Sequence, residues 1–152
     1  MTFLSKIIER VAASQLIAYL EINKLLPVCQ SGFRKGHSTE TLLLRLLSDI
    51  YGAVDRSRLT LLALFDVSAA FDTVDHEILL KRLQLSFGLS GNFIAWLASF
   101  LDGRSLCVVH GSSRSQWVPA PHGLPQGSVL APLLYIIYTS ELGPLLTDCA
   151  LL

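Results

Sequence analysis

Apolar residues near the N-terminus recur at the spacing of an α-helix: they are Ile7, Val11, Leu16, Ile17 and Leu20. This period predicts an amphipathic helix from about Ser5 to Leu20. A second helix is expected from about Thr39 to Val54, because the polar loop before it ends in Ser38, a residue type that caps helices. Pro27 closes the tail of the first helical segment, since proline interrupts a helix.

The segment Leu59–Phe65 differs from both helices because it is short and almost continuously apolar. Such a run is typical of a strand that is covered on both faces. We therefore expect a central strand here, ending just before Asp66.

The C-terminal half combines helical signals with one hairpin signal. Helices are expected over about 75–85, from a cap at Ser90 to just before Gly103, and over about 129–142. Pro132 is tolerated only in a first turn, which places the start of the last helix near Ser128. Residues 105–110 and 116–120 flank the polar run Gly111–Arg114, which predicts a β-hairpin with a short loop.

Composition indicates a folded chain. Of 152 residues, 51% are hydrophobic and 16% are charged, which excludes a disordered or polybasic protein. The 12 Lys and Arg balance the 12 Asp and Glu, and this neutrality argues against strong nonspecific binding to nucleic acid by this piece alone. No apolar stretch reaches the roughly 18 residues of a membrane span. The cysteines, Cys29, Cys107 and Cys149, form no Cys-x-x-Cys pair and are expected to be thiols in a reducing compartment. We thus expect an intracellular protein, nuclear or cytoplasmic, outside the membrane.

Asp66 is the first candidate for chemistry because it follows the predicted strand. Nucleotidyl transfer uses two divalent cations about 3.5–4 Å apart, held by carboxylates on rigid backbone. Magnesium takes oxygen ligands, usually one or two protein carboxylates together with phosphates and water, so a single well-placed Asp is a legitimate half of such a site. The alternative interpretation of Asp66 is a helix cap or a turn residue.

Phe71 also has two interpretations. Its ring is either the floor beneath a bound sugar or a core residue, and the second is the commoner fate of a phenylalanine. Nearby, Asp72, Asp75 and His76 form a cluster that could ligate a metal. We instead expect Asp72 or Asp75 to cap the following helix and His76 to hydrogen-bond locally, so this cluster is left out of the catalytic residues.

The segment Gly123–Ser128 contains two glycines and a proline and opens into the last predicted helix. Backbone N–H groups and the positive end of the helix dipole at such a junction attract phosphate or a template backbone. Gln126 both donates and accepts hydrogen bonds, which suits a nucleotide sugar or base. A plain loop-to-helix junction is the alternative, and the functional interpretation gains weight only beside the Asp66 segment.

Three segments in this order resemble sequence blocks of reverse transcriptases from non-LTR retrotransposons, the LINE or jockey-like group. Gln30–Thr39 resembles their fingers motif, Phe65–His76 their motif A, and Gly123–Leu142 their motif B. The resemblance implies an α+β fold, a partial right-hand polymerase in which helices pack on a small antiparallel sheet. It implies a fingers-like part at about 1–58 and a palm-like part at about 59–152.

The resemblance also implies roles for single residues. Asp66 is the implied metal-ligating catalytic carboxylate, and Phe71 is the implied steric gate against a ribose 2′-hydroxyl. Gln126 and Gly127 are implied to line the incoming-nucleotide and template site. Two basic residues of the fingers motif are implied to lie near the triphosphate or the template backbone: Arg34 and Lys35. Magnesium is the cofactor implied for a complete domain, and the implied partners are an RNA template, a DNA primer and deoxynucleoside triphosphates.

The chain departs from the family pattern after motif B. The family continues with a Tyr-Ala-Asp-Asp hairpin, which carries the other metal-binding carboxylates, and then with a thumb; neither is present in this sequence. Glu141, near the end of motif B, and Asp148 are the only acidic residues from Gly123 onward, and neither lies in such a block. We therefore expect a fragment of a mobile element whose RNA-directed DNA polymerase activity requires a longer protein.

Two other hypotheses remain. The chain is alternatively an inert relic or a nucleic-acid-binding piece without catalysis, and the reading frame downstream of Leu152 separates this hypothesis from the first. A small phosphohydrolase that uses Asp66 is disfavoured, because Ser68 stands where an aspartate-nucleophile phosphatase needs its second Asp.

Overall fold

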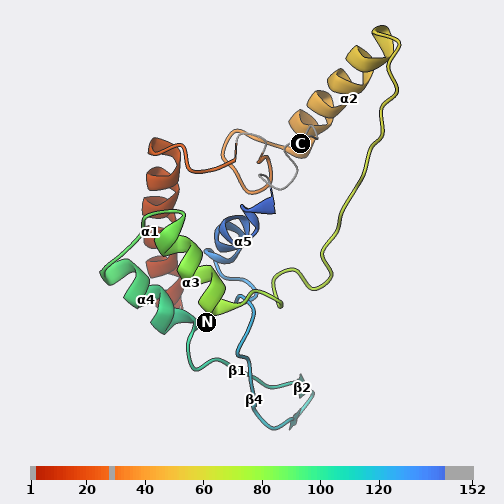
Figure 1. Cartoon of the computed structure of the whole chain (residues 1–152). Helices are drawn as coiled ribbons and strands as arrows, with labels where there is room; N and C mark the ends of the chain where they lie inside the picture. The colour runs from red at the N-terminus through yellow and green to blue at the C-terminus, as the bar shows by residue number, and fades with distance from the viewer. Residues whose placement is uncertain (1–2, 28–29, 143–152) are drawn as a thin grey trace. The chain divides into compact units, whose positions relative to one another are not determined.

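The computed structural model describes residues 3–27 and 30–142 of the chain (Figure 1). These residues belong to two compact units. The first unit comprises Met1–Leu25 and Ala69–Thr139, and the second comprises Leu26–Ser68 and Ser140–Leu152.

The helices of the first unit are α1 (Phe3–Ile22), α3 (His76–Leu85), α4 (Asn92–Leu101) and α5 (Ala131–Thr139). Helix α3 packs against both α4 and α5. Aliphatic side chains from these helices form a core that excludes solvent, among them Leu20, Leu79, Leu83, Leu97, Leu134 and Ile137. The four helices expected in these segments are confirmed, with small shifts at their ends. Pro132 lies in the first turn of α5, as predicted.

The buried face of α1 differs in part from the predicted one. The residues that it buries are Glu9, Ala13, Leu16 and Leu20, which share one face at helical spacing. Ile7, Val11 and Ile17 belong to the predicted apolar stripe, yet their side chains are 39–54% exposed. The helix carries apolar residues on more than one face, so periodicity alone did not identify the face that the core covers.

Helix α4 starts one residue later than the predicted cap implies. Gly91 occupies the N-cap position with φ 64°, and no side chain hydrogen-bonds to the helix start, so the expected Ser90 cap is wrong. The predicted end is correct, because Gly103 follows α4 with φ 63°, a conformation that glycine adopts without strain.

The predicted hairpin is present. Strand β1 (Ser105–Leu106) pairs antiparallel with β4 (Val118–Pro119), and β2 (Val109–His110) pairs with β3 (Ser113–Arg114). Gly111 enters the tight turn with φ 59°, as such hairpin turns require. All the strand residues are exposed. The mixed α+β character is thus confirmed. The described strands form two separate two-stranded sheets, and the main helix contacts are those of α3 with α4 and α5, so the expected packing of helices on one small sheet is not confirmed.

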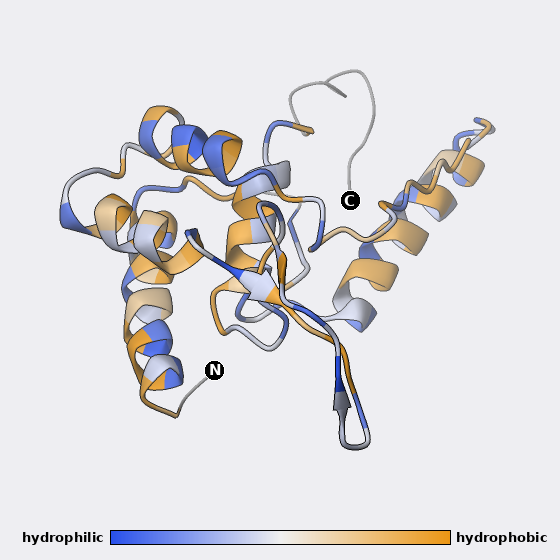
Figure 2. Cartoon of the chain, turned by 90° about the horizontal axis from the view of Figure 1, so that it is seen from below, coloured by the Kyte–Doolittle hydropathy of each residue, from blue (hydrophilic) through white to orange (hydrophobic). Residues whose placement is uncertain are grey.

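The second unit contains α2 (Thr39–Asp55), which confirms the predicted helix. Ser38 and Thr41 form a capping box: Thr41 N donates to Ser38 Oγ over 3.3 Å, and Ser38 N donates to Thr41 Oγ1 over 2.9 Å. Helix α2 buries none of its residues. Hydrophobic and hydrophilic residues both colour it along its length in Figure 2, as in an amphipathic helix.

The central strand expected at Leu59–Phe65 is wrong. These residues form no regular secondary structure, and Figure 1 draws them as part of an extended stretch between α2 and α3. Leu59 and Leu61 are 101% and 95% exposed, so the segment is not covered on either face. An apolar run indicates a tendency to be buried, but it does not supply a pairing partner, and no strand of the described residues pairs with this one.

Two smaller expectations concern the membrane and the cysteines. Within residues 3–27 and 30–142, no helix has both the length and the apolarity that crossing a membrane requires. Cys107 carries a free thiol and is half-buried. Cys29 and Cys149 lie outside the described residues.

Candidate functional site

The motif A segment enters the first unit through a tight turn, Ala69–Thr73. The Ala69 carbonyl oxygen accepts hydrogen bonds from Asp72 N (2.8 Å) and Thr73 N (3.2 Å). Ala69 itself has φ 52°, a left-handed conformation that is uncommon for a residue other than glycine. This turn reverses the chain and brings Phe71 back toward the rest of the unit.

The Gly123–Ser128 loop docks against this turn through main-chain hydrogen bonds. Leu124 N donates to the Phe71 carbonyl oxygen over 2.7 Å, and Gly123 N donates to the Val74 carbonyl oxygen over 2.8 Å. The side chain of His76 reaches the same place, since its Nε2 lies 2.7 Å from the Gly123 carbonyl oxygen. His76 therefore bonds to a residue 47 positions away, and the expectation of a local bond is wrong. The structure thus brings the motif A and motif B segments together.

Gly123 cannot be replaced without moving this contact. A Cβ built on it would lie 2.9 Å from the Asp72 carbonyl oxygen and 3.0 Å from the Asp72 Cα. Real Cβ atoms essentially never approach this closely, and Gly123 also has φ 90°, which favours glycine. The two chain segments approach one another because residue 123 has no side chain.

Phe71 is half-buried beside helix α5. Its ring packs on Tyr135 with a centroid distance of 5.0 Å and an interplanar angle of 41°. The main chain of Phe71 holds the start of the loop, while the loop's tip, Gln126 and Gly127, is exposed. Three of the predicted site residues therefore belong to one substructure: Phe71, Gln126 and Gly127.

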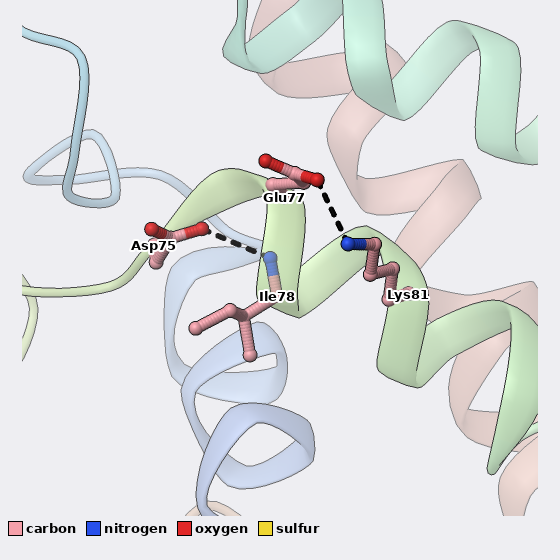
Figure 3. Close-up of polar contacts among 4 residues, drawn as sticks. All are labelled: Asp75, Glu77, Ile78 and Lys81. Atoms are coloured by element: carbon pink, nitrogen blue, oxygen red, sulfur yellow. Dashed lines mark hydrogen bonds and ion pairs between the residues drawn. The ribbon is translucent and has the colours of Figure 1, made fainter.

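Helix α3 begins at the motif A segment, and Asp75 caps it (Figure 3). Asp75 Oδ1 accepts from Ile78 N over 2.9 Å, which confirms the predicted capping role for one of the two candidate aspartates. This hydrogen bond holds the pKa of the Asp75 carboxyl below its usual range. One turn further on, Lys81 Nζ donates to Glu77 Oε1 over 2.8 Å, and this bond raises the pKa of Lys81. Asp75 therefore has a structural role, which supports its exclusion from the catalytic residues.

The remaining predicted site residues belong to the second unit. Asp66 is exposed, and its Oδ1 accepts from Val67 N over 2.9 Å. It does not follow a buried strand, because the preceding segment is extended and exposed. Arg34 is half-buried, and its Nη1 donates to the Pro27 carbonyl oxygen over 3.2 Å, whereas Lys35 is exposed.

The described residues do not complete a metal site. Within residues 3–27 and 30–142, no group of three or more His, Cys, Asp or Glu side chains is placed to hold an ion. An exposed carboxylate can offer one oxygen ligand to a divalent cation, and the second oxygen of Asp66 accepts no hydrogen bond within the described residues. One carboxylate is fewer than a two-metal centre needs.

Glu9 is a polar residue of this substructure that the sequence analysis missed. Its Oε2 accepts from Ser128 Oγ over 2.7 Å and from Val129 N over 2.9 Å, at the end of the Gly123–Ser128 loop. The sequence carries no signal for it, because the apolar residues of α1 do not single out the face on which Glu9 lies, and only the structure shows that this face is buried. An acidic residue at a core position of an amphipathic helix indicates a buried polar partner.

The second unit also carries a shallow groove along α2. Its lining residues include none of the predicted site residues: they are Leu44, Leu47, Ser48, Tyr51, Gly52 and Asp55. The groove is mostly apolar, and its lining gives no reason to assign catalysis to it.

Comparison with known proteins finds relatives that are RNA-directed DNA polymerases of mobile elements. Two relatives from Drosophila melanogaster are the probable RNA-directed DNA polymerase from transposon X-element, 34% identical over 139 residues, and the one from transposon BS, 35% identical over 142 residues. The RNA-directed DNA polymerase from the mobile element jockey, from the same organism, is 32% identical over 139 residues. The matched residues make up 91–93% of this chain but only 15–16% of each relative. No solved structure matches the chain significantly.

The match to a protein family covers more of this chain than the match to any of these three relatives. Residues 1–150 match the family described as "Reverse transcriptase (RNA-dependent DNA polymerase)". Together with the relatives from jockey and the X-element, this match confirms the resemblance to the reverse transcriptases of non-LTR retrotransposons. The chain belongs to the reverse transcriptase family.

Proposed function

We propose that this chain supplies the fingers-like part, about 1–58, and part of the palm, about 59–152, of an RNA-directed DNA polymerase. The observation that carries the proposal is the docking of the Gly123–Ser128 loop on the Ala69–Thr73 turn. A polymerase must hold its nucleotide-facing groups on rigid backbone, and the backbone contacts between these two segments provide such a support.

Phe71 is proposed as the steric gate. A gate discriminates by a clash, which requires a ring that does not move away from the extra hydroxyl. The Leu124 hydrogen bond fixes the Phe71 backbone, and the Tyr135 contact restricts its ring. These contacts are also compatible with a core residue, so the proposal is tested below by ribonucleotide discrimination.

Gln126, Gly127 and the basic residues of the fingers motif are proposed to bind nucleotide and template. Gln126 is exposed and carries both a donor and an acceptor. Gly127 has φ 76°, and a Cβ there would have open space around it, so a substrate backbone has room to approach it closely. Lys35 is exposed and supplies a positive charge for a phosphate, and Arg34 lies next to it in the chain.

Asp66 is proposed as one carboxylate ligand of a Mg²⁺ ion in a longer protein. The described residues do not provide the other ligands, and no catalytic step is assigned to a metal on these residues alone. The 152-residue chain is therefore expected to show no primer extension by itself.

The experiment uses a reading frame that extends this chain to the length of the jockey polymerase. Purified protein is given an RNA template, a DNA primer, deoxynucleoside triphosphates and Mg²⁺. Extension that is abolished by Asp66→Asn but retained by Asp72→Asn supports the proposal, since Asp72 is a nearby exposed carboxylate in the same motif. Equal activity of the Asp66→Asn variant and the parent protein contradicts it.

Two further results separate the proposed roles. Phe71→Ala should admit ribonucleotides, and unchanged discrimination would identify Phe71 as a core residue only. If the extended frame is interrupted, or if the long protein binds primer and template without extending the primer, the chain is instead a relic or a binding fragment without catalysis.

A further inference from the structure

Glu9 occupies a position where a carboxylate is costly. It lies on the buried face of α1, whose other members are Ala13, Leu16 and Leu20, and its residue surface is only 1% exposed. Carboxylates are rarely this buried, because losing their hydration costs several kcal/mol unless hydrogen bonds replace it. The partners of Glu9 therefore define what this side chain does.

Those partners, Ser128 and Val129, lie just before α5. Glu9 Oε2 accepts from Ser128 Oγ (2.7 Å) and from Val129 N (2.9 Å), and Ser128 Oγ in turn accepts from Leu130 N (3.1 Å). Amides before and in the first turn of a helix have no acceptor within the helix, and the positive end of the helix dipole favours a negative charge there. Glu9 thus holds the turn that leads into α5, and it does so from a helix about 120 residues earlier in the sequence.

The hydrogen bonds of Glu9 to Ser128 and Val129 hold one end of the Gly123–Ser128 loop. The Ala69–Thr73 turn and Val74 hold the other end through the hydrogen bonds of Gly123 and Leu124. Gln126 and Gly127 lie between the two anchored ends and are exposed. Loss of either anchor would remove hydrogen bonds that hold one end of this stretch.

We propose that Glu9 is a positioning residue, which fixes the Gly123–Ser128 loop and so sets the place of Gln126 and Gly127. This inference rests on the proposed function where it concerns nucleotide binding, but the anchoring of the loop is independent of it. Glu9 does not touch the proposed substrate surface itself, because its hydrogen bonds go to the helix start and its side chain is buried.

The unpartnered oxygen of Glu9 allows a discriminating substitution. Oε1 is buried and has no hydrogen-bond partner among the described residues, and the hydrogen bonds from Ser128 and Val129 both go to Oε2. In Glu9→Gln the amide oxygen can accept both bonds while the amide nitrogen takes the place of Oε1. This variant keeps the shape and both bonds but places amide N–H groups where Oε1 has no partner, which costs stability, whereas Glu9→Ala loses both bonds. The order of loop stability should therefore be parent, then Glu9→Gln, then Glu9→Ala.

Amide hydrogen exchange of the 152-residue chain tests the anchoring. Glu9→Ala should accelerate exchange about tenfold in peptides that cover 124–131, as expected for the loss of the two hydrogen bonds of Glu9, with a smaller change in α3 and α4. Gln15→Ala is the matched control, because Gln15 is an exposed polar residue of similar length on the same helix. Ser128→Ala removes the other side of the contact and should accelerate the same peptides. If Glu9→Ala does not fold, Glu9→Gln and Ser128→Ala carry the test.

The result that overturns the inference is an equal acceleration throughout α3, α4 and the loop, which indicates a general packing role, or no acceleration at all. In the extended polymerase, Glu9→Ala should raise the KM for deoxynucleotides about tenfold with a smaller change in kcat, because the lost interaction orders the binding loop. Local acceleration of exchange in a protein that never extends a primer would confirm the anchoring and contradict the proposed function. Unchanged exchange would overturn the anchoring whatever the activity.

Discussion

Replacing Gly123 by alanine should separate the two segments that form the proposed site. The new methyl group would lie 2.9 Å from the Asp72 carbonyl oxygen, 3.0 Å from its Cα and 3.2 Å from its carbonyl carbon. All three atoms belong to the main chain, so no side-chain rotation relieves the overlap. The backbone of the Gly123–Ser128 loop or of the Ala69–Thr73 turn must therefore move.

The expected cost follows from two contributions. An alanine held at φ 90° costs about 1–2 kcal/mol relative to glycine, because its Cβ meets the neighbouring backbone. Movement of the loop also weakens the hydrogen bonds of Gly123 N and Leu124 N, each worth about 1 kcal/mol net. We expect Gly123→Ala to lower the free energy of unfolding by about 3 kcal/mol, a large part of a typical domain's stability of about 5–15 kcal/mol.

Gly103→Ala is the matched control. Gly103 also has positive φ (63°) and lies in the same unit, but a Cβ there meets nothing within 4 Å. It should cost only the conformational part, about 1 kcal/mol. Urea unfolding of both variants is followed by tryptophan fluorescence in a Trp117→Phe background, so that the signal comes from Trp96, which packs between Phe93 and Phe100 on α4. Equal losses of stability in the two variants would refute the close approach of residues 72 and 123.

Three further predictions concern other parts of the chain. Because the folded-state pKa of Asp75 is lowered, its contribution to stability is present above the unfolded pKa of about 3.9 and is lost as the pH falls through the folded value. Asp75→Asn keeps a capping oxygen without titrating, so its urea midpoint should fall less than that of the parent between about pH 6 and about pH 3, and parallel curves would contradict this reasoning. Ser38→Ala should destabilise α2 by about 1 kcal/mol through loss of the capping box, visible as faster amide exchange confined to the first turns of α2. Leu59→Lys combined with Leu61→Lys should change the free energy of unfolding by no more than about 1 kcal/mol and should reduce binding of a hydrophobic dye, because both side chains are exposed; a larger loss of stability would show that the segment is covered.

The parts of the fold that the sequence predicted depend on local chemistry. Ser38 caps α2 because its hydroxyl lies next to the amides that need an acceptor, and this requires no information about the rest of the chain. Pro132 limits the start of α5 in the same way, and Gly111 permits the tight turn of the hairpin. Each of these residues acts on backbone within four positions of itself.

The errors concern partners that lie far away in the sequence. Leu59–Phe65 has the composition of a buried strand, but burial requires another segment to cover it, and the run does not specify one. His76 was assigned a local hydrogen bond, whereas its acceptor is 47 residues away. Glu9 was overlooked because an acidic residue interrupts an apolar stripe, and only the structure shows the turn before α5 to which it bonds. The roles of Asp66, Phe71, Gln126, Gly127, Arg34 and Lys35 came from resemblance and stay predictions.

The two anchors of the Gly123–Ser128 loop differ in chemistry, and this difference has a consequence for substitutions. At the first anchor, Leu124 N and Gly123 N bond to carbonyl oxygens, so most side-chain changes in the Ala69–Thr73 turn leave these bonds intact. A side chain added at residue 123 is the exception, because it would occupy the space where the backbones meet. At the second anchor, α1 contributes only a side chain, because the acceptor of both hydrogen bonds is the Glu9 carboxylate. Truncation of Glu9 therefore removes both hydrogen bonds of this anchor. At the first anchor, truncation of His76 removes one side-chain bond, to the Gly123 carbonyl oxygen, but leaves the two main-chain bonds in place.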